Sequence, residues 1–181
     1  MATKTFHRGV ADLKFAAWNS ENSYGTAYDV LGVREFTLEL ELESDQLEGD
    51  DVVLDRFSKI ISASFGFEQA AVDLEVLDMI TGGTLVSNAS YEDIMVDEAS
   101  MPYIAVAVKV DASDAGKDLH IFLPKCKMSE NLSLQASYGE YLLPSASFQA
   151  VKEGSTNGIM RARKFSATTA LEIPLRTSTG S

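Results

Sequence analysis

Residues 37–43 read Thr-Leu-Glu-Leu-Glu-Leu-Glu, a strict alternation of apolar and acidic side chains. Successive side chains of a β-strand point to opposite faces of the sheet, so the three leucines share one face and the three glutamates the other. Leucine and glutamate both favour helix, but a helix would scatter the carboxylates around its circumference. The period therefore predicts a half-buried strand, with Leu38, Leu40 and Leu42 together on one face.

The same alternation recurs along the chain and predicts further strands. It covers residues 59–67 (Ile61, Ala63, Phe65 and Phe67 on one face), 104–110, 119–123 up to Pro124, 132–138, 146–150 and 165–173. One helix is predicted where Ala70, Leu74 and Leu77 recur at helical spacing ahead of Gly82-Gly83, because glycine commonly ends a helix. About eight strands and one short α-helix, without a dividing linker, indicate a mostly β protein that forms a single-domain β-sandwich or barrel. Residues 1–8 and 176–181 are expected to be flexible or partner-bound arms.

The composition restricts the class of partner. The 181 residues hold 27 Asp and Glu against 15 Lys and Arg, a net charge of −12. So acidic a surface argues against a duplex-binding protein and against an anionic membrane as partner. A single cysteine, Cys126, excludes an internal disulfide. The opening MATKTFHRGV has no apolar signal core, so synthesis in a cytoplasm is expected.

Groups suited to catalysis are few. The chain has two histidines, and His120 lies six residues before Cys126. We interpret this pair as a surface imidazole and a small buried thiol rather than as a nucleophile and its base. Metal-ligand spacings and glycine-rich phosphate loops are missing from the sequence, so no enzymatic activity, no cofactor and no metal are predicted.

Two charged features of the sequence can each be interpreted either as ordinary solvent-exposed surface or as part of an assembly interface. Glu39, Glu41 and Glu43, extended by Asp45, form either the solvent face of an antiparallel sheet or the inner wall of an assembly. Duplex DNA carries one charge per ~1.7 Å of axis and screening acts over ~8 Å, so an acidic wall would repel passing DNA without gripping it. The basic cluster of Arg161, Arg163 and Lys164 is either a solvated hairpin end or a socket for acids of a neighbouring copy, namely Glu48, Asp50 and Asp51.

The order of the predicted elements resembles a known family. It runs from the strand EFTLELELESD (35–45) through the loop QLEGDDVVLD (46–55) and the strand SKIISASFGFEQ (58–69) to a helix ending VLDMITGGTLV (76–86). Paired strands follow in LHIFLPKCKMSENLSLQASYGEYLLPSASFQAV (119–151). Together these segments resemble a major tail tube protein of a long-tailed, siphovirus-type bacteriophage.

The resemblance implies a structural role. Six copies would form a ring, and the rings would stack into a hollow tail tube through which DNA leaves the virion without specific binding. Glu39, Glu41, Glu43 and Asp45 would line the lumen, and the leucines that alternate with them, Leu38, Leu40 and Leu42, would lie in the subunit core. The loop Gln46–Asp55 would contact a neighbouring subunit, mainly through Gln46, Leu47, Glu48, Gly49, Asp50 and Asp51. The tape-measure, tail-tip and tail-terminator proteins would be further partners.

Other interpretations stay open on the sequence. The chain could be the tube protein of a secretion-type or tailocin apparatus. From a different class, it could be a β-sandwich module that binds sugar or peptide through Trp18, Tyr138 and Tyr141, or an enzyme that uses Cys126 or an acid pair. A measurement of particle size would separate a tube protein from the last two.

Overall fold

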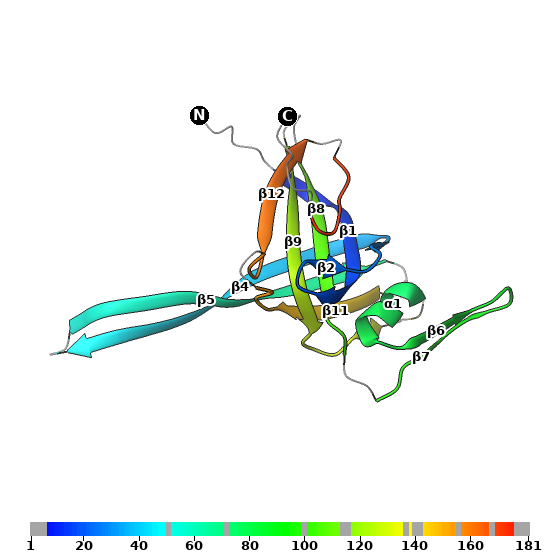
Figure 1. Ribbon diagram of the computed structural model, residues 1–181, viewed down its shortest axis with the longest axis horizontal. Helices are drawn as coiled ribbons and strands as arrows, with labels where there is room; N and C mark the ends of the chain where they lie inside the picture. The colour runs from blue at the N-terminus through cyan, green and yellow to red at the C-terminus, as the bar shows by residue number, and fades with distance from the viewer. Residues whose placement is uncertain are drawn as a thin grey trace.

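Two β layers cross steeply, a short helix closes one end of the core, and two hairpins project from the body (Figure 1). The computed structural model describes residues 7–49, 52–70, 73–98, 101–112, 117–135, 138, 143–154, 157–166 and 169–175. The predicted arms at residues 1–6 and 176–181 lie outside these ranges, whereas residues 7 and 8 open the first strand.

The protein is mostly β, as predicted, and has one helix, α1 (Leu74–Thr81), in the described part. Its strands are β1 (His7–Ser20), β2 (Ser23–Tyr24), β3 (Tyr28–Asp29), β4 (Val33–Gly49), β5 (Val52–Gln69), β6 (Thr84–Ser87), β7 (Glu92–Met95), β8 (Ile104–Ala112), β9 (Lys117–Met128), β10 (Ser133–Gln135), β11 (Leu143–Ala150) and β12 (Arg161–Ser166).

Ten of these strands form one antiparallel sheet that folds back on itself. Its order is β2-β1-β8-β9-β11-β5-β4, with β3 beside β1, β12 beside β9 and β10 beside β11. The two layers join where the end of β9 pairs with the end of β11, from Phe148↔Met128 to Ala150↔Cys126. One layer therefore holds β1, β8, β9 and β12, and the other holds β11, β5 and β4. Strands β6 and β7 form a separate two-stranded sheet.

The core lies between the two layers and is rich in phenylalanine. Phe15 from β1 makes an edge contact with Phe67, at 5.3 Å between ring centroids, and Phe65 stacks on Phe148 at 5.6 Å. Edge and offset contacts of this kind add to the free energy of burying the rings. The predicted strands at 104–110 and 146–150 contribute to this core as expected.

Helix α1 is shorter than predicted because Asp73 caps it. The Asp73 carboxylate accepts hydrogen bonds from the backbone N–H groups of Glu75 (3.0 Å) and Val76 (3.5 Å), so Ala70 lies outside the helix. The helix ends at Gly82 with φ of 69°, the left-handed cap that the glycines predicted. Val76 and Ile80 face the core, and Leu77 is only half-buried, so the apolar stripe is rotated from the predicted one.

Two other strand predictions were wrong in extent. Strand β9 continues through Pro124 to Met128, because a register shift against β8 between Ile104 and Val106 accommodates the proline. Residues 169–175 are not a strand. Leu171 and Leu175 instead cover Phe122 on the outer face of the sheet and form a second, smaller apolar cluster.

Candidate functional site

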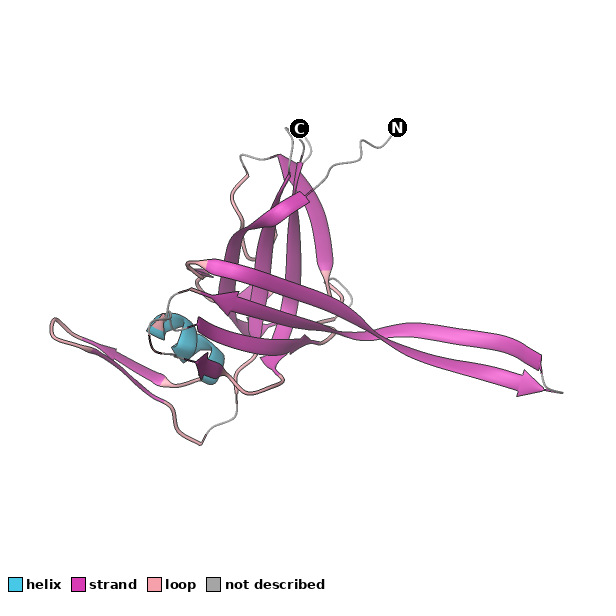
Figure 2. Cartoon of the chain, turned by 180° about the vertical axis from the view of Figure 1, so that it is seen from behind, coloured by secondary structure: helices cyan, strands magenta, loops and turns pink. Residues whose placement is uncertain are grey.

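The longest feature outside the core is the hairpin of β4 and β5, which continues far beyond the body (Figures 1 and 2). We call its outer part, residues 40–49 and 52–61, the arm. The predicted loop 46–55 is mostly strand, since β4 runs to Gly49 and β5 starts at Val52. Gln46 and Leu47 are exposed near its tip, and Asp50 and Asp51 lie outside the described residues.

Only the first of the three alternating leucines is in the core. Leu38 packs against the main cluster, but Leu40 is 43% exposed and Leu42 is 65% exposed. The prediction that all three are core residues was wrong, because β4 leaves the sandwich after Leu38 and no second layer covers its continuation. Side chains continue to alternate between the two faces of the hairpin along the arm, but the leucines of the arm are no longer buried.

A bulge at Ile61 sets the side-chain pattern of the arm. Glu41 pairs with Ser62 and Leu42 pairs with Ile60, so Ile61 has no partner on β4. Ile61 is therefore exposed and does not share the face of Ala63, Phe65 and Phe67, which corrects the prediction for that strand. Beyond the bulge, Leu40, Leu42 and Ile60 share one face, which we call the arm apolar face.

The acidic residues occupy the opposite face of the same hairpin, as the period predicted. Glu39 and Glu43 are exposed, and Asp45 follows them toward the tip. Glu41 is tied across three strands, because its carboxylate accepts hydrogen bonds from Ser62 Oγ and from Gln149 Nε2 (3.0 Å). Alternate residues on a strand lie ~7 Å apart, within the screening length, so these carboxylates repel each other, although Lys59 of β5 lies opposite Glu43 on the same face.

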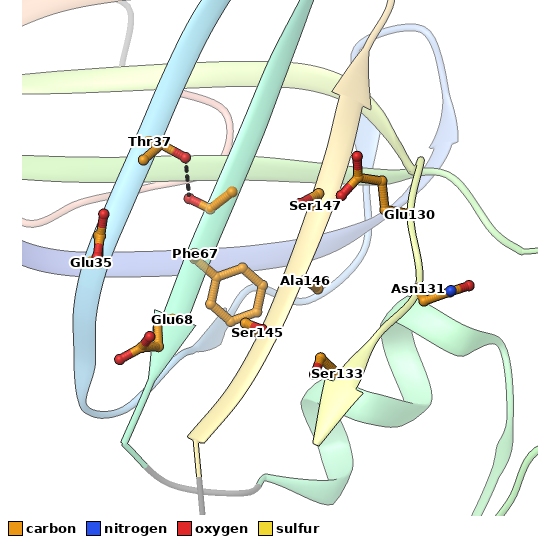
Figure 3. A pocket seen from close by; sticks show the side chains of 11 residues that line it. Glu35, Thr37, Phe67, Glu68, Glu130, Asn131, Ser133, Ser145, Ala146 and Ser147 are labelled. Atoms are coloured by element: carbon orange, nitrogen blue, oxygen red, sulfur yellow. Dashed lines mark hydrogen bonds between the residues drawn. The ribbon is translucent and has the colours of Figure 1, made fainter. Parts of the chain in front are cut away.

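The polar face continues onto the body as a shallow groove. Two adjoining hollows of about 330 and 430 Å³ share Thr37, Gly66, Glu130 and Ser147. Figure 3 shows the first, with Thr37 Oγ1 donating to the Gly66 carbonyl (3.5 Å) across β4 and β5. A Cβ at Gly66 would lie 2.8 Å from Thr37 Oγ1, so a larger residue there would require the Thr37 side chain to move. Hydroxyl groups and carboxylates dominate the lining, which carries no basic residue.

The predicted basic cluster is divided by its strand. Residues 161–164 belong to β12, on which Arg161 and Arg163 are half-buried and Lys164 is exposed on the opposite face. The Arg163 guanidinium lies 5.9 Å from the centre of the Phe165 ring. The three cations therefore do not form one socket on a single face of the subunit.

His120 is buried, contrary to the prediction of a surface imidazole. It lies under Phe165 (4.7 Å between ring centroids), and neither ring nitrogen has a hydrogen-bond partner. Burial lowers the pKa of His120, and so does the ammonium of Lys109 on β8, whereas Asp118 opposes the shift. Lys109 also pairs with the buried Asp118 at 3.1 Å.

Cys126 is fully buried in the main core, as predicted, and burial raises the pKa of its thiol. A raised pKa leaves little of the reactive thiolate at neutral pH. No group of three or more His, Cys, Asp or Glu residues suited to a metal ion occurs in the described part of the chain.

Trp18 is held by other residues of its own chain, which limits it as a stacking platform. Its indole N–H donates to Glu153 (2.8 Å), and the Lys125 ammonium lies 4.1 Å from its ring centre. Glu153 also accepts hydrogen bonds from Tyr24 Oη, Asn22 N and Asn157 Nδ2. Tyr138 is fully exposed, and Tyr141 lies outside the described residues.

This network around Glu153 was not predicted, because three of its members, Trp18, Asn22 and Tyr24, lie 129–135 residues from Glu153 in the chain. The sequence analysis also did not predict that the polar side of β11, with Ser145, Ser147 and Gln149, continues the acidic face of β4. Its signal was present, since polar residues alternate there with Ala146, Phe148 and Ala150.

A scan against protein-family profiles and a search of curated proteins both returned no match. Among the described residues, no helix is long and apolar enough to cross a bilayer.

Proposed function

We propose that this protein is a structural subunit that assembles into stacked hexameric rings and forms the hollow tail tube of a long-tailed bacteriophage. The arm is the observation that carries the proposal. It is a long two-stranded ribbon whose apolar residues, Leu40, Leu42 and Ile60, stay exposed in a single subunit. An isolated two-stranded ribbon is at best marginally stable in water, so the arm needs support from another chain.

The edge of the sheet supports the same conclusion. Strand β4 is the last strand in the sheet order and, in the described part, it hydrogen-bonds only to β5. A strand edge of this length is an aggregation hazard unless it is covered, twisted or paired. Closure of a ring by neighbouring copies pairs such edges and removes the hazard.

In this proposal, the acidic face allows DNA to pass through the tube without being bound. Glu39, Glu41, Glu43 and Asp45 line the lumen in this proposal, next to the serines and Gln149 of β5 and β11. Anionic DNA passing within ~8 Å is repelled from such a wall and is not retained by it. The subunit therefore needs no catalytic group and no cofactor, and it guides its cargo by shape and charge.

The other partners follow from the same role. The subunit contacts further copies of itself along the tube and meets the tape-measure, tail-tip and tail-terminator proteins of the virion. It is made in the host cytoplasm and functions in the particle.

Particle size and shape test this function. The purified chain is concentrated stepwise and followed by sedimentation and negative-stain imaging. Rings or hollow rods are expected, whereas a sugar- or peptide-binding module stays near the chain mass of 19.6 kDa at every concentration. A persistent monomer, also in the presence of preformed tail tips, would refute the proposal. A secretion-type or tailocin tube also gives rods, and DNA inside intact particles distinguishes the phage tube from it.

A further inference from the structure

A second exposed apolar surface lies on the other projecting hairpin, formed by β6 and β7. Val86 is 50% exposed and Met95 is 64% exposed. Val86 pairs with Asp93 and Thr84 pairs with Met95, so these side chains share one face, whereas Leu85 and Ile94 are half-buried on the other. We call the exposed side, Thr84, Val86, Asp93 and Met95, the hairpin outer face.

The β6–β7 hairpin is ordered before any partner arrives. At its turn, the Asn88 side chain accepts hydrogen bonds from the backbone N–H groups of Ser90 (2.9 Å) and Tyr91 (3.2 Å). At its base, a Cβ on Gly83 would lie 3.0 Å from the Met95 carbonyl oxygen, so the hairpin packs tightly onto the end of α1. A preorganised apolar face loses little conformational entropy when it is covered.

The two exposed apolar surfaces differ in the charges that lie beside them. Residues 73–98, which hold α1 and this hairpin, include seven acidic residues and no basic residue. The arm as a whole is also acidic, with five acidic residues against Arg56 and Lys59, but Lys59 pairs with Glu43 and lies on the acidic face. Arg56 pairs with Gln46 and therefore lies on the same side of the arm as Leu42 and Ile60.

The two hairpins extend from opposite ends of the molecule (Figures 1 and 2). A surface at one end that fits a surface at the other produces a heterologous, head-to-tail contact, which closes into a ring or continues as a filament. A symmetric pair of copies would use one surface twice and would leave the other uncovered. A second copy of this chain offers both the apolar area and, at Arg56, a positive charge on the same face.

We infer that the arm apolar face of one copy packs on the hairpin outer face of a second copy, with Arg56 directed toward the acidic hairpin. This inference rests on the proposed assembly and names the surface that receives the arm. It places the receptor on the α1–β6–β7 unit instead of the basic residues of β12.

Cysteine crosslinking of the full chain tests this contact. A double variant carries Leu42→Cys and Met95→Cys, both at exposed positions, while the native Cys126 is fully buried. Assembled protein is treated with a short bismaleimide and run on a denaturing gel. A ladder of multimers is expected from the double variant, because each chain then links to two others. Each single variant should lack the ladder.

A matched control variant combines Leu42→Cys with Lys164→Cys, since Lys164 is exposed on β12, which lies on the other side of the body from the β6–β7 hairpin (Figure 1). It should also lack the ladder. If tubes form but the Leu42/Met95 variant does not crosslink, or if the control crosslinks equally, this contact is wrong and the proposed function stands. If the unmodified chain forms no rings or tubes at all, the proposed function itself fails. Circular dichroism of each variant verifies that the fold is retained.

Discussion

Replacement of Leu42 by alanine should impair assembly far more than it impairs folding. Leu42 is 65% exposed in the subunit, so only about a third of its surface is removed from water when the chain folds. Leucine to alanine removes three carbon atoms, worth about 2.4 kcal/mol on full burial at ~0.8 kcal/mol each. The expected loss in free energy of unfolding is therefore about 0.8 kcal/mol.

In the proposed tube, another subunit covers the arm and buries the remaining two thirds of that surface. Loss of this part of the leucine surface should destabilise the assembled state by about 1.6 kcal/mol per contact. The critical concentration for assembly should therefore rise roughly tenfold. Leu134→Ala is the matched control, because Leu134 is 51% exposed on β10, outside the arm. It should change folding by a similar amount and leave the critical concentration where it was.

Two measurements decide the outcome. Urea unfolding of dilute subunit gives the free energy of unfolding, and pelleting over a concentration series gives the critical concentration. The reasoning fails if Leu42→Ala assembles at the original concentration, because the arm apolar face would then stay in water. It also fails if the variant loses more than about 2 kcal/mol of folding free energy, because Leu42 would then be a core residue of the subunit.

Three further predictions follow from charged and titratable groups. Glu153→Gln should lower the free energy of unfolding by about 2 kcal/mol at pH 7, because a buried carboxylate that accepts several hydrogen bonds is lost. Burial alone would raise the pKa of Glu153, but these hydrogen bonds lower it below its ordinary value of 4.5, so its contribution is present above pH 4.5 and disappears as the pH falls through the lowered pKa. Urea unfolding at pH 7 and at pH 3 should therefore show the variant closest to the native sequence in acid, and an equal deficit at both pH values would contradict this. The lowered pKa of His120 predicts that the native chain loses stability as the pH falls below about 6.5, where the unfolded chain takes up the proton first. His120→Phe should reduce the drop in melting temperature between pH 7 and pH 5, and an unchanged drop would place the proton uptake elsewhere. Conversion of Glu39, Glu41 and Glu43 together to lysine should leave tubes intact but slow DNA release from particles by about tenfold or more. The lysines would attract the passing DNA, and about 1.4 kcal/mol of added barrier is enough to slow release tenfold. Release at the native rate would count against their position in the lumen.

Much of the fold could be predicted because the relevant signals are local. Alternation over 104–110 and 146–150 identified β8 and β11, since a strand with one buried face repeats every two residues. Gly82 marked the end of α1, because a left-handed cap favours glycine at that position. The shared acidic face of Glu39, Glu41 and Glu43 followed from the same period.

Other features could not be predicted because their causes are not local. The Glu153 network joins Glu153 to Trp18 and Tyr24, more than a hundred positions away, and the nearby partner Asn157 does not indicate them. The β6–β7 hairpin has four-residue strands, too short for a reliable period. The burial of His120 depends on a distant residue, since Phe165 covers the imidazole only after β12 pairs with β9.

Strand β4 shows which properties the sequence alone determines and which depend on the tertiary structure. Its sequence alone determined which side chains lie on the same face, because alternation is a property of the extended backbone itself. Whether that face is covered depends on how far the opposing layer of the sandwich extends, and this layer ends near Leu38. Only the tertiary structure could therefore separate Leu38, which packs against the core, from Leu40 and Leu42, whose apolar surface is exposed in the subunit.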